Sequence, residues 1–187
     1  NTMVGSSTVY ASDAGGNVLA TIDAATGLTT TLAGAEGQQG YVDGPVSRWA
    51  GPIGIAIDAA GEILYVSDTA NEVIRKFTLA TGIASTILGR PYTSASAAVD
   101  GQGVETAYVA KNMPGLIAVD GNGFLYQNDV NDGTTPFVRV VELSTGKIAT
   151  IAGGFMMNYG IAVSADGAVY VSDAVAEVFY AYGVPPT

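Results

Sequence analysis

Short apolar runs separated by turn residues make up most of the chain. Between residues 53 and 88 the runs read "IGIAID", "EILYVSD", "EVIRKFTL" and "IASTIL", with "DAAG", "DTAN" and "ATG" at the breaks. β-Branched and aromatic runs of this length are typical of strands, and Gly, Asp and Asn at the breaks are typical of tight turns. No segment keeps a 3.6-residue period over three turns, so the pattern predicts an all-β chain. It predicts three consecutive antiparallel strands across residues 62–88, with no helix among them.

One phrase recurs four times along the chain. In each copy a Tyr stands three residues before an Asp: Tyr10 and Asp13, Tyr65 and Asp68, Tyr126 and Asp129, Tyr170 and Asp173. Gly27, Gly82 and Gly146 follow in "ATG" or "STG", and a second Gly comes at a constant distance after each of these. These offsets predict repeats at approximately 1–34, 46–89, 108–153 and 156–184. The shared Tyr is expected to pack between neighbouring sheets.

Four-stranded units repeating at this interval are typical of β-propeller blades. The extra length falls in two connections, "AEGQQGYVDGPVSRWA" and "RPYTSASAAVDGQGVETAYVAKN", whereas "GFMMN" makes the third. The terminal units lack one strand each, at opposite positions, which leaves about four blades with unpaired edges. We therefore expect an incomplete, open arc. Missing blades would come from other sequence or from neighbouring copies joined head-to-tail, so the 187 residues alone should associate.

The second unit resembles the NHL-repeat family of β-propellers. The matching residues are Asp43-Gly44, Trp49, Pro52, Gly54 to Asp58, Gly61, Tyr65 to Asp68, Asn71 and Ile74. The third unit is similar at Asp100-Gly101, Tyr108, Pro114 to Asp120, Tyr126 and Asp129, but has a "NDGTTP" insertion. The resemblance implies a propeller fold, and a function that ranges in that family from binding scaffold to sensor and, in a few members, enzyme.

Composition and charge exclude several classes of partner and of catalytic site. The chain has 17 acidic and 7 basic residues, a net charge of −10, and neither Cys nor His. The scattered basic residues make nucleic acid an unfavourable partner, and no apolar run is long enough to insert into a membrane. Without Cys or His, thiol nucleophiles, imidazole catalysis and thiolate metal sites are excluded. No cofactor is expected.

The repeated aspartates could be metal ligands or acid/base groups. The set is Asp13, Asp58, Asp68, Asp120, Asp129 and Asp173. Because an Asp occurs once or twice in every unit, capping of turns is favoured over metal binding. The innermost strands, "GIAID", "LIAVD" and "GIAVS", are apolar until their last residue. We therefore expect no catalytic and no metal-binding residues.

The two long connections are better candidates for a site. They carry aromatic and cationic residues, which anchor interfaces more often than other types. The partner-binding residues that we predict are Tyr41, Arg48, Tyr92 and Lys111. Trp49 and Tyr108 occupy the aromatic position of the NHL pattern, so packing under the loop is favoured for those two.

These observations predict a non-enzymatic interaction or structural scaffold, part of a larger extracellular or cell-surface protein. Its partner would be a protein, including further copies of itself, or a glycan. The alternative is a propeller enzyme of the lactonase or lyase type, which a stabilising response to divalent cations would favour.

Overall fold

The regular secondary structure of the described residues is β-strand, apart from one short 3-10 turn. The computed structural model describes residues 8–91, 100–102, 115–131, 135–155, 158–164, 167–173 and 178–182. At residues 102, 130, 131, 135, 158, 159 and 178–182 it describes the backbone alone. No helix in these residues is long and apolar enough to cross a membrane.

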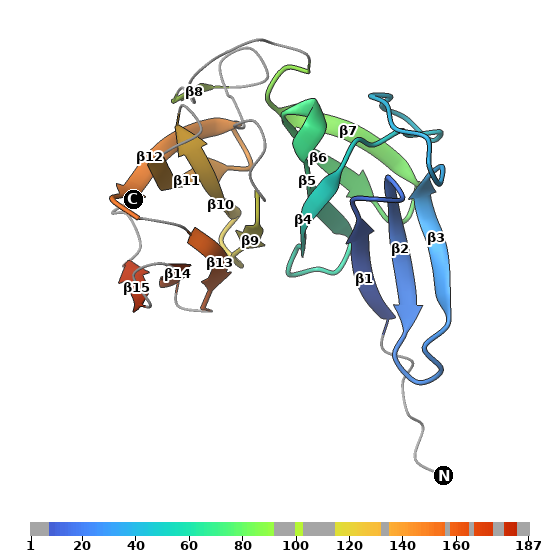
Figure 1. Cartoon of the computed structure of the whole chain (residues 1–187), viewed down its shortest axis with the longest axis horizontal. Helices are drawn as coiled ribbons and strands as arrows, with labels where there is room; N and C mark the ends of the chain where they lie inside the picture. The colour runs from blue at the N-terminus through green and yellow to red at the C-terminus, as the bar shows by residue number, and fades with distance from the viewer. Residues whose placement is uncertain are drawn as a thin grey trace.

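The strands form four antiparallel sheets, which we call blades 1 to 4 (Figure 1). Blade 1 contains β1 (Thr8–Asp13), β2 (Val18–Asp23) and β3 (Thr29–Gly34). Blade 2 contains β4 (Pro52–Ile57), β5 (Ile63–Asp68), β6 (Val73–Thr78) and β7 (Ile83–Leu88). Blade 3 contains β9 (Ile117–Val119), β10 (Phe124–Asn131), β11 (Thr135–Glu142) and β12 (Lys147–Gly153), with β8 (Gly101–Gln102) added at its outer edge. Blade 4 contains β13 (Asn158–Val163), β14 (Val169–Asp173) and β15 (Val178–Tyr182).

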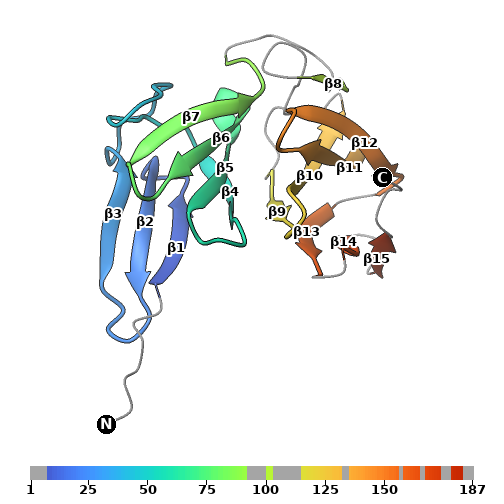
Figure 2. The same ribbon diagram turned by 180° about the vertical axis from the view of Figure 1, so that it is seen from behind.

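The blades follow one another in chain order round an arc, with blades 1 and 4 at its two ends (Figures 1 and 2). The strands β1, β4, β9 and β13 contact one another in series along the inside of this arc. β1 matches β5 in sequence rather than β4, so blade 1 has no described innermost strand; blade 4 has no described outermost strand. The arc is an incomplete propeller, as the strand pattern predicts.

Three apolar clusters hold the blades together, one at each junction. Leu19, Trp49 and Leu64 belong to the cluster between blades 1 and 2. Tyr65, Ile74 and Leu125 belong to the one between blades 2 and 3, and Tyr126, Val138 and Val171 to the one between blades 3 and 4. Successive residues of a strand point to opposite faces, so each blade contributes to the clusters on both of its sides. The predicted packing of the repeated Tyr between sheets is confirmed for Tyr65 and Tyr126. It is wrong for Tyr170, which is 46% exposed because no described blade follows blade 4.

The turns follow the sequence with one exception. Gly27, Gly82 and Gly146 adopt positive φ (73°, 67° and 69°) in the hairpins where the repeat places them, a conformation that other residues resist. The three strands expected across residues 62–88 are present, but β5 and β6 are joined by one 3-10 turn, η1 (Thr69–Asn71). The expectation that this segment has no helical residue is therefore wrong at the turn, where the backbone wraps towards residues 50 and 51.

Candidate functional site

Residues 36–48, which we call the rim loop, leave blade 1 and cross to the outer edge of blade 2. The Gly44 amide donates to the carbonyl oxygen of Ala84 in β7 at 2.8 Å, and the Ala84 amide donates back to Gly44 at 3.2 Å. The loop also pairs with itself at Val42 and Arg48. The first long connection is thus an ordered extension of blade 2, and β8 is the corresponding extension of blade 3.

A buried arginine from β6 holds the rim loop in place. Arg75 is fully buried, and its Nη1 lies 3.0 Å from Oδ2 of the equally buried Asp68. Its Nη2 lies 2.8 Å from Oδ1 of Asp43 in the rim loop, and its Nε donates to the same oxygen at 3.0 Å. Arg75 also donates to the carbonyl oxygens of Val42 and Arg48. One side chain therefore ties three positions of the loop to the second and third strands of blade 2.

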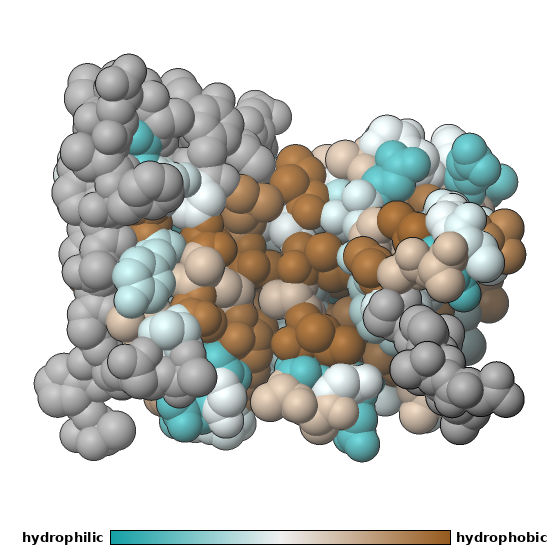
Figure 3. Space-filling view, turned by 90° about the horizontal axis from the view of Figure 1, so that it is seen from below, coloured by the Kyte–Doolittle hydropathy of each residue, from teal (hydrophilic) through white to brown (hydrophobic). Residues whose placement is uncertain are grey.

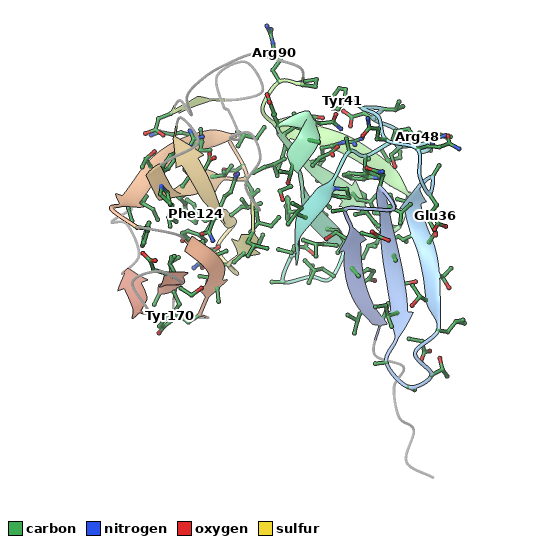
Figure 4. All side chains as sticks on the ribbon, viewed as in Figure 1. Glu36, Tyr41, Arg48, Arg90, Phe124 and Tyr170 are labelled. Atoms are coloured by element: carbon green, nitrogen blue, oxygen red, sulfur yellow. The ribbon has the colours of Figure 1, made fainter. Side chains whose placement is uncertain are left out.

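Two aromatic side chains complete this cluster. Cζ of Arg75 lies 4.1 Å from the ring centre of Trp49 and 5.4 Å from that of Tyr41, within the range of cation–π attraction. Trp49 is fully buried, which confirms its predicted packing role. The Tyr41 hydroxyl lies 2.7 Å from Oγ1 of Thr86 in β7. Figure 4 shows Tyr41, Arg48 and Glu36 gathered around the rim loop at one end of the molecule.

Blade 3 repeats the arrangement around Arg139. Its Nη1 lies 3.2 Å from Oδ2 of Asp129, and its Nη2 lies 3.3 Å from Oδ1 of Asp100. Asp100 also accepts hydrogen bonds from the amide and hydroxyl of Thr150, just as Asp43 does from Thr86. Each interior blade is therefore closed by an Asp–Arg–Asp cluster that includes one aspartate from the connection preceding it.

The two kinds of aspartate in these clusters differ in electrostatics. Burial raises the pKa of Asp68 above its ordinary 3.8, although hydrogen bonds from Asn71 and Ala50 and the charge of Arg75 act against this. Partial burial also acts to raise the pKa of Asp100, but hydrogen bonds from Thr150 and the charge of Arg139 outweigh it and bring that pKa below 3.8. Burial therefore disfavours the ionised form of Asp68, and the charge of Arg75 is needed to stabilise that carboxylate.

The burial of Arg75 and Arg139 was not expected from the sequence, in which the basic residues are scattered along the chain. A signal was present: both follow the repeated Asp, and both units are preceded by an Asp-Gly pair. The prediction that the repeated aspartates cap turns holds for Asp13, Asp58 and Asp120, which accept hydrogen bonds from backbone amides of the following residues. It is incomplete for Asp68 and Asp129, whose carboxylates form ion pairs.

The four predicted partner-binding residues are only partly described. Tyr41 and Arg48 both lie in the rim loop, half-buried, and Arg48 donates through Nη1 to the carbonyl oxygen of Ser47. Tyr92 and Lys111, together with Tyr108, lie outside the described residues. Among the described residues no group of three or more acidic side chains is arranged to hold a metal ion.

Comparisons with known proteins identify the architecture. No protein-family model and no curated protein matches the chain. A gluconolactonase from Xanthomonas campestris is similar in structure, with a TM-score of 0.64, 16% identity, and 96% of this chain and 55% of that chain covered. An auxiliary nutrient binding protein from Bacteroides thetaiotaomicron is also similar (TM-score 0.61, 15% identity, 90% and 43% covered). So is one from Bacteroides ovatus (TM-score 0.60, 18% identity, 92% and 44% covered).

The chain thus spans about half the length of these structural relatives. They are propeller-type proteins, and at these identities the likeness concerns the fold. Together with the four sheets it identifies the chain as part of a β-propeller.

Proposed function

We propose that this chain is a non-enzymatic binding module that presents the rim loop to a partner. The observation that carries the proposal is the fixation of the loop by Arg75. A loop held in one conformation loses little entropy on binding, so its exposed groups contribute to affinity more fully.

The surface that this loop presents is apolar with a cationic neighbour. Val46 is 68% exposed and Val42 is 45% exposed, although both are aliphatic residues of the loop that Arg75 holds. Arg48 lies beside them with part of its side chain accessible. Apolar groups with an adjacent Arg are the composition that protein interfaces favour.

The partner that fits best is a protein, which includes further copies of this chain, or a glycan. The net charge of −10 disfavours nucleic acid and anionic surfaces. An extracellular or cell-surface location and membership of the NHL-repeat family remain parts of the proposal. Two of the structural relatives are named as auxiliary nutrient binding proteins, which is compatible with a binding role.

A pair of variants with equal exposure tests the proposal. Val46→Asp changes a rim-loop residue that is 68% exposed, and Leu28→Asp changes a residue of the blade 1 hairpin that is 67% exposed. A protein or glycan that binds the wild type is first identified on an array. We expect the Val46→Asp variant to bind this partner at least about tenfold more weakly, a loss of about 1.4 kcal/mol in binding free energy. Leu28→Asp should bind as the wild type does. Equal binding by all three proteins would contradict the rim loop as the site.

The alternative, a lactonase- or lyase-type enzyme, is tested by the same purified protein. One structural relative is named as a gluconolactonase, and this motivates the test. Thermal melts with and without Mg²⁺, Ca²⁺, Mn²⁺ or Zn²⁺ would reveal a site that binds the folded state, because ligand binding raises the melting temperature. A rise with one cation would favour the enzyme, and we expect none.

A further inference from the structure

The turn between β9 and β10 contains Asn122-Gly123, which is the only Asn-Gly pair in the sequence. Asn122 is exposed, and its side chain forms no hydrogen bond within the described residues. Asparagine is among the thermolabile residues, because its side-chain amide can react with the main chain. A following Gly favours that reaction, since it has no Cβ atom to hinder the close approach of its own amide nitrogen.

The hydrogen bonds of this turn leave the Gly123 amide unused. Oδ1 of Asp120 accepts from the amides of Asn122 and Phe124 at 2.9 Å and 2.8 Å. The Asp120 amide in turn donates to the carbonyl oxygen of Phe124 at 3.0 Å. The Gly123 amide lies between these donors in sequence and donates to no acceptor in the described structure. The nitrogen that can attack the Asn122 side chain is therefore available.

The other asparagines whose side chains are described lack these conditions. Asn71 and Asn128 are 1% and 2% exposed, so water has little access to them. The Asn17 side chain accepts a hydrogen bond from the Gly51 amide. Asn17 also precedes Val18, whose branched side chain crowds the main chain. Among these side chains, only that of Asn122 combines exposure, a following Gly and an amide nitrogen without an acceptor.

We propose that Asn122 is a site of spontaneous deamidation, at which the chain acquires isoaspartate and aspartate. Hydroxide removes the proton of the Gly123 amide, and the nitrogen attacks Cγ of Asn122. A new C–N bond closes a succinimide ring while the bond from Cγ to the side-chain nitrogen breaks, and water returns the proton to the leaving ammonia. One further water molecule then adds to either ring carbonyl and opens the ring. This chemistry does not involve the rim loop.

The product would disturb the weakest inner strand. Isoaspartate places an extra methylene group in the main chain and adds a negative charge, within a turn whose amides Asp120 holds. β9 contains only three residues and, in the described structure, pairs only with β10, yet it contacts both β4 and β13. The turns after β4 and β9 lie at the lower end of the molecule in Figure 1. Figure 3 shows this end, with polar groups beside a band of apolar surface. We expect conversion to loosen β9 and lower the melting temperature.

Incubation of the full 187-residue chain in mildly alkaline buffer tests the proposal. Samples taken over time are digested, and mass spectrometry with peptide fragmentation locates each conversion of an amide to an acid. Labelling by an isoaspartyl methyltransferase distinguishes isoaspartate from aspartate. We expect both products at Asn122, formed faster as the pH rises, while Asn17 and Asn71 stay unchanged.

The equivalent turn of blade 2 provides a matched control. Asp58 caps that turn through the amides of Glu62 and Ile63, and the exposed Ala60 precedes Gly61 there. The Gly61 amide, however, donates to the carbonyl oxygen of Asp58 at 3.0 Å. Ala60→Asn therefore creates an Asn-Gly pair whose amide is already engaged. We expect the introduced asparagine to convert about fivefold more slowly than Asn122, because the amide must first give up its hydrogen bond.

A second variant, Asn122→Ala, gives this turn the residue that blade 2 has at the same place. We expect it to keep its melting temperature during incubation, whereas that of the wild type falls as isoaspartate accumulates. An unchanged Asn122 in the wild type would overturn the proposal. Equal rates at Asn122 and at the asparagine introduced at position 60 would contradict the role of the free Gly123 amide. An equal fall in melting temperature for the wild type and Asn122→Ala would contradict the effect on β9.

Discussion

The interior blades and the end blades contain the same repeated tyrosine in different surroundings. Tyr65 in blade 2 is 7% exposed and Tyr126 in blade 3 is fully buried, because each faces the apolar side of the blade that follows. Tyr170 in blade 4 occupies the same register but is 46% exposed, and no following blade covers it in the described structure. The burial of a repeated residue therefore depends on the neighbouring blade as much as on its own blade.

The buried charges divide the molecule in the same way. Arg75 and Arg139 lie at equivalent positions of blades 2 and 3, opposite Val66 and Gln127. The residues at that position in blades 1 and 4 are Ala20 and Tyr180, opposite Ala11 and Val171. An arginine is present only where a long connection brings an Asp-Gly pair to the outer edge of the blade. Buried charge, its partner and the long loop thus occur together.

The largest expected effect comes from breaking a buried ion pair in an interior blade. Arg75→Ala should cost about 3–5 kcal/mol of unfolding free energy, because it leaves the buried Asp68 carboxylate without its cation. Urea melts followed by circular dichroism measure this loss. Lys76→Ala, at the next position of the same strand but half-exposed, should cost much less. Adding Asp68→Asn to Arg75→Ala should recover part of the loss, and an additive double variant would argue against the pair.

The tyrosine comparison is tested by two identical substitutions. Tyr65→Ala should cost about 2–4 kcal/mol, because it opens a cavity between blades 2 and 3. Tyr170→Ala should change the stability by less than about 0.5 kcal/mol, as expected for a surface position. Denaturant midpoints of the two variants give the difference. Equal losses would mean that the exposed face of blade 4 is covered in solution.

The next prediction concerns Gly54 in β4, the inner strand of blade 2. A Cβ atom at Gly54 would overlap the carbonyl oxygen of Gly115 and approach Oγ of Ser67 to 2.8 Å. Gly54→Ala should therefore cost about 1–3 kcal/mol through overpacking at the junction of blades 2 and 3. Gly121, in a turn of blade 3, has no atom within 4 Å of the place that a Cβ would occupy, so Gly121→Ala should be within about 0.5 kcal/mol of the wild type. Thermal melts that rank the two the other way would contradict the close approach of the inner strands.

The smallest expected effect is confined to alkaline pH. Burial, with the nearby charge and hydrogen bond of Asp120, raises the pKa of Tyr126 from 10.0 to about 12. Because the folded state disfavours the phenolate, the stability due to the neutral hydroxyl is fully present below pH 10.0 and is lost as the pH rises towards about 12. Tyr126→Phe should lose less stability over this interval. Parallel pH profiles of the two proteins would show that Tyr126 is accessible to solvent.

The candidate site could be predicted from the sequence only in part. The rim loop is visible in the sequence as an interruption of the repeat, and Trp49 as the aromatic position of the NHL-like pattern. The function of Arg75 could not be read in the same way, because Asp43, its partner in the rim loop, lies 32 residues away in the sequence. The pairing of the loop with β7 depends on where the outer strand lies after folding. Tyr41 is a similar case, since its hydroxyl contact is with Thr86.

The sequence by itself determines the strands, the hairpin glycines and the repeat. These features depend on local conformational preference and on the period-two alternation of a strand, and both can be read from adjacent residues. The tertiary structure decides which apolar faces are covered, which charges are buried and which strand edge is open. Such properties depend on contacts between segments that are distant in the chain. Tyr65 and Tyr170 have nearly the same local sequence, and only the presence of a following blade makes one of them part of the core.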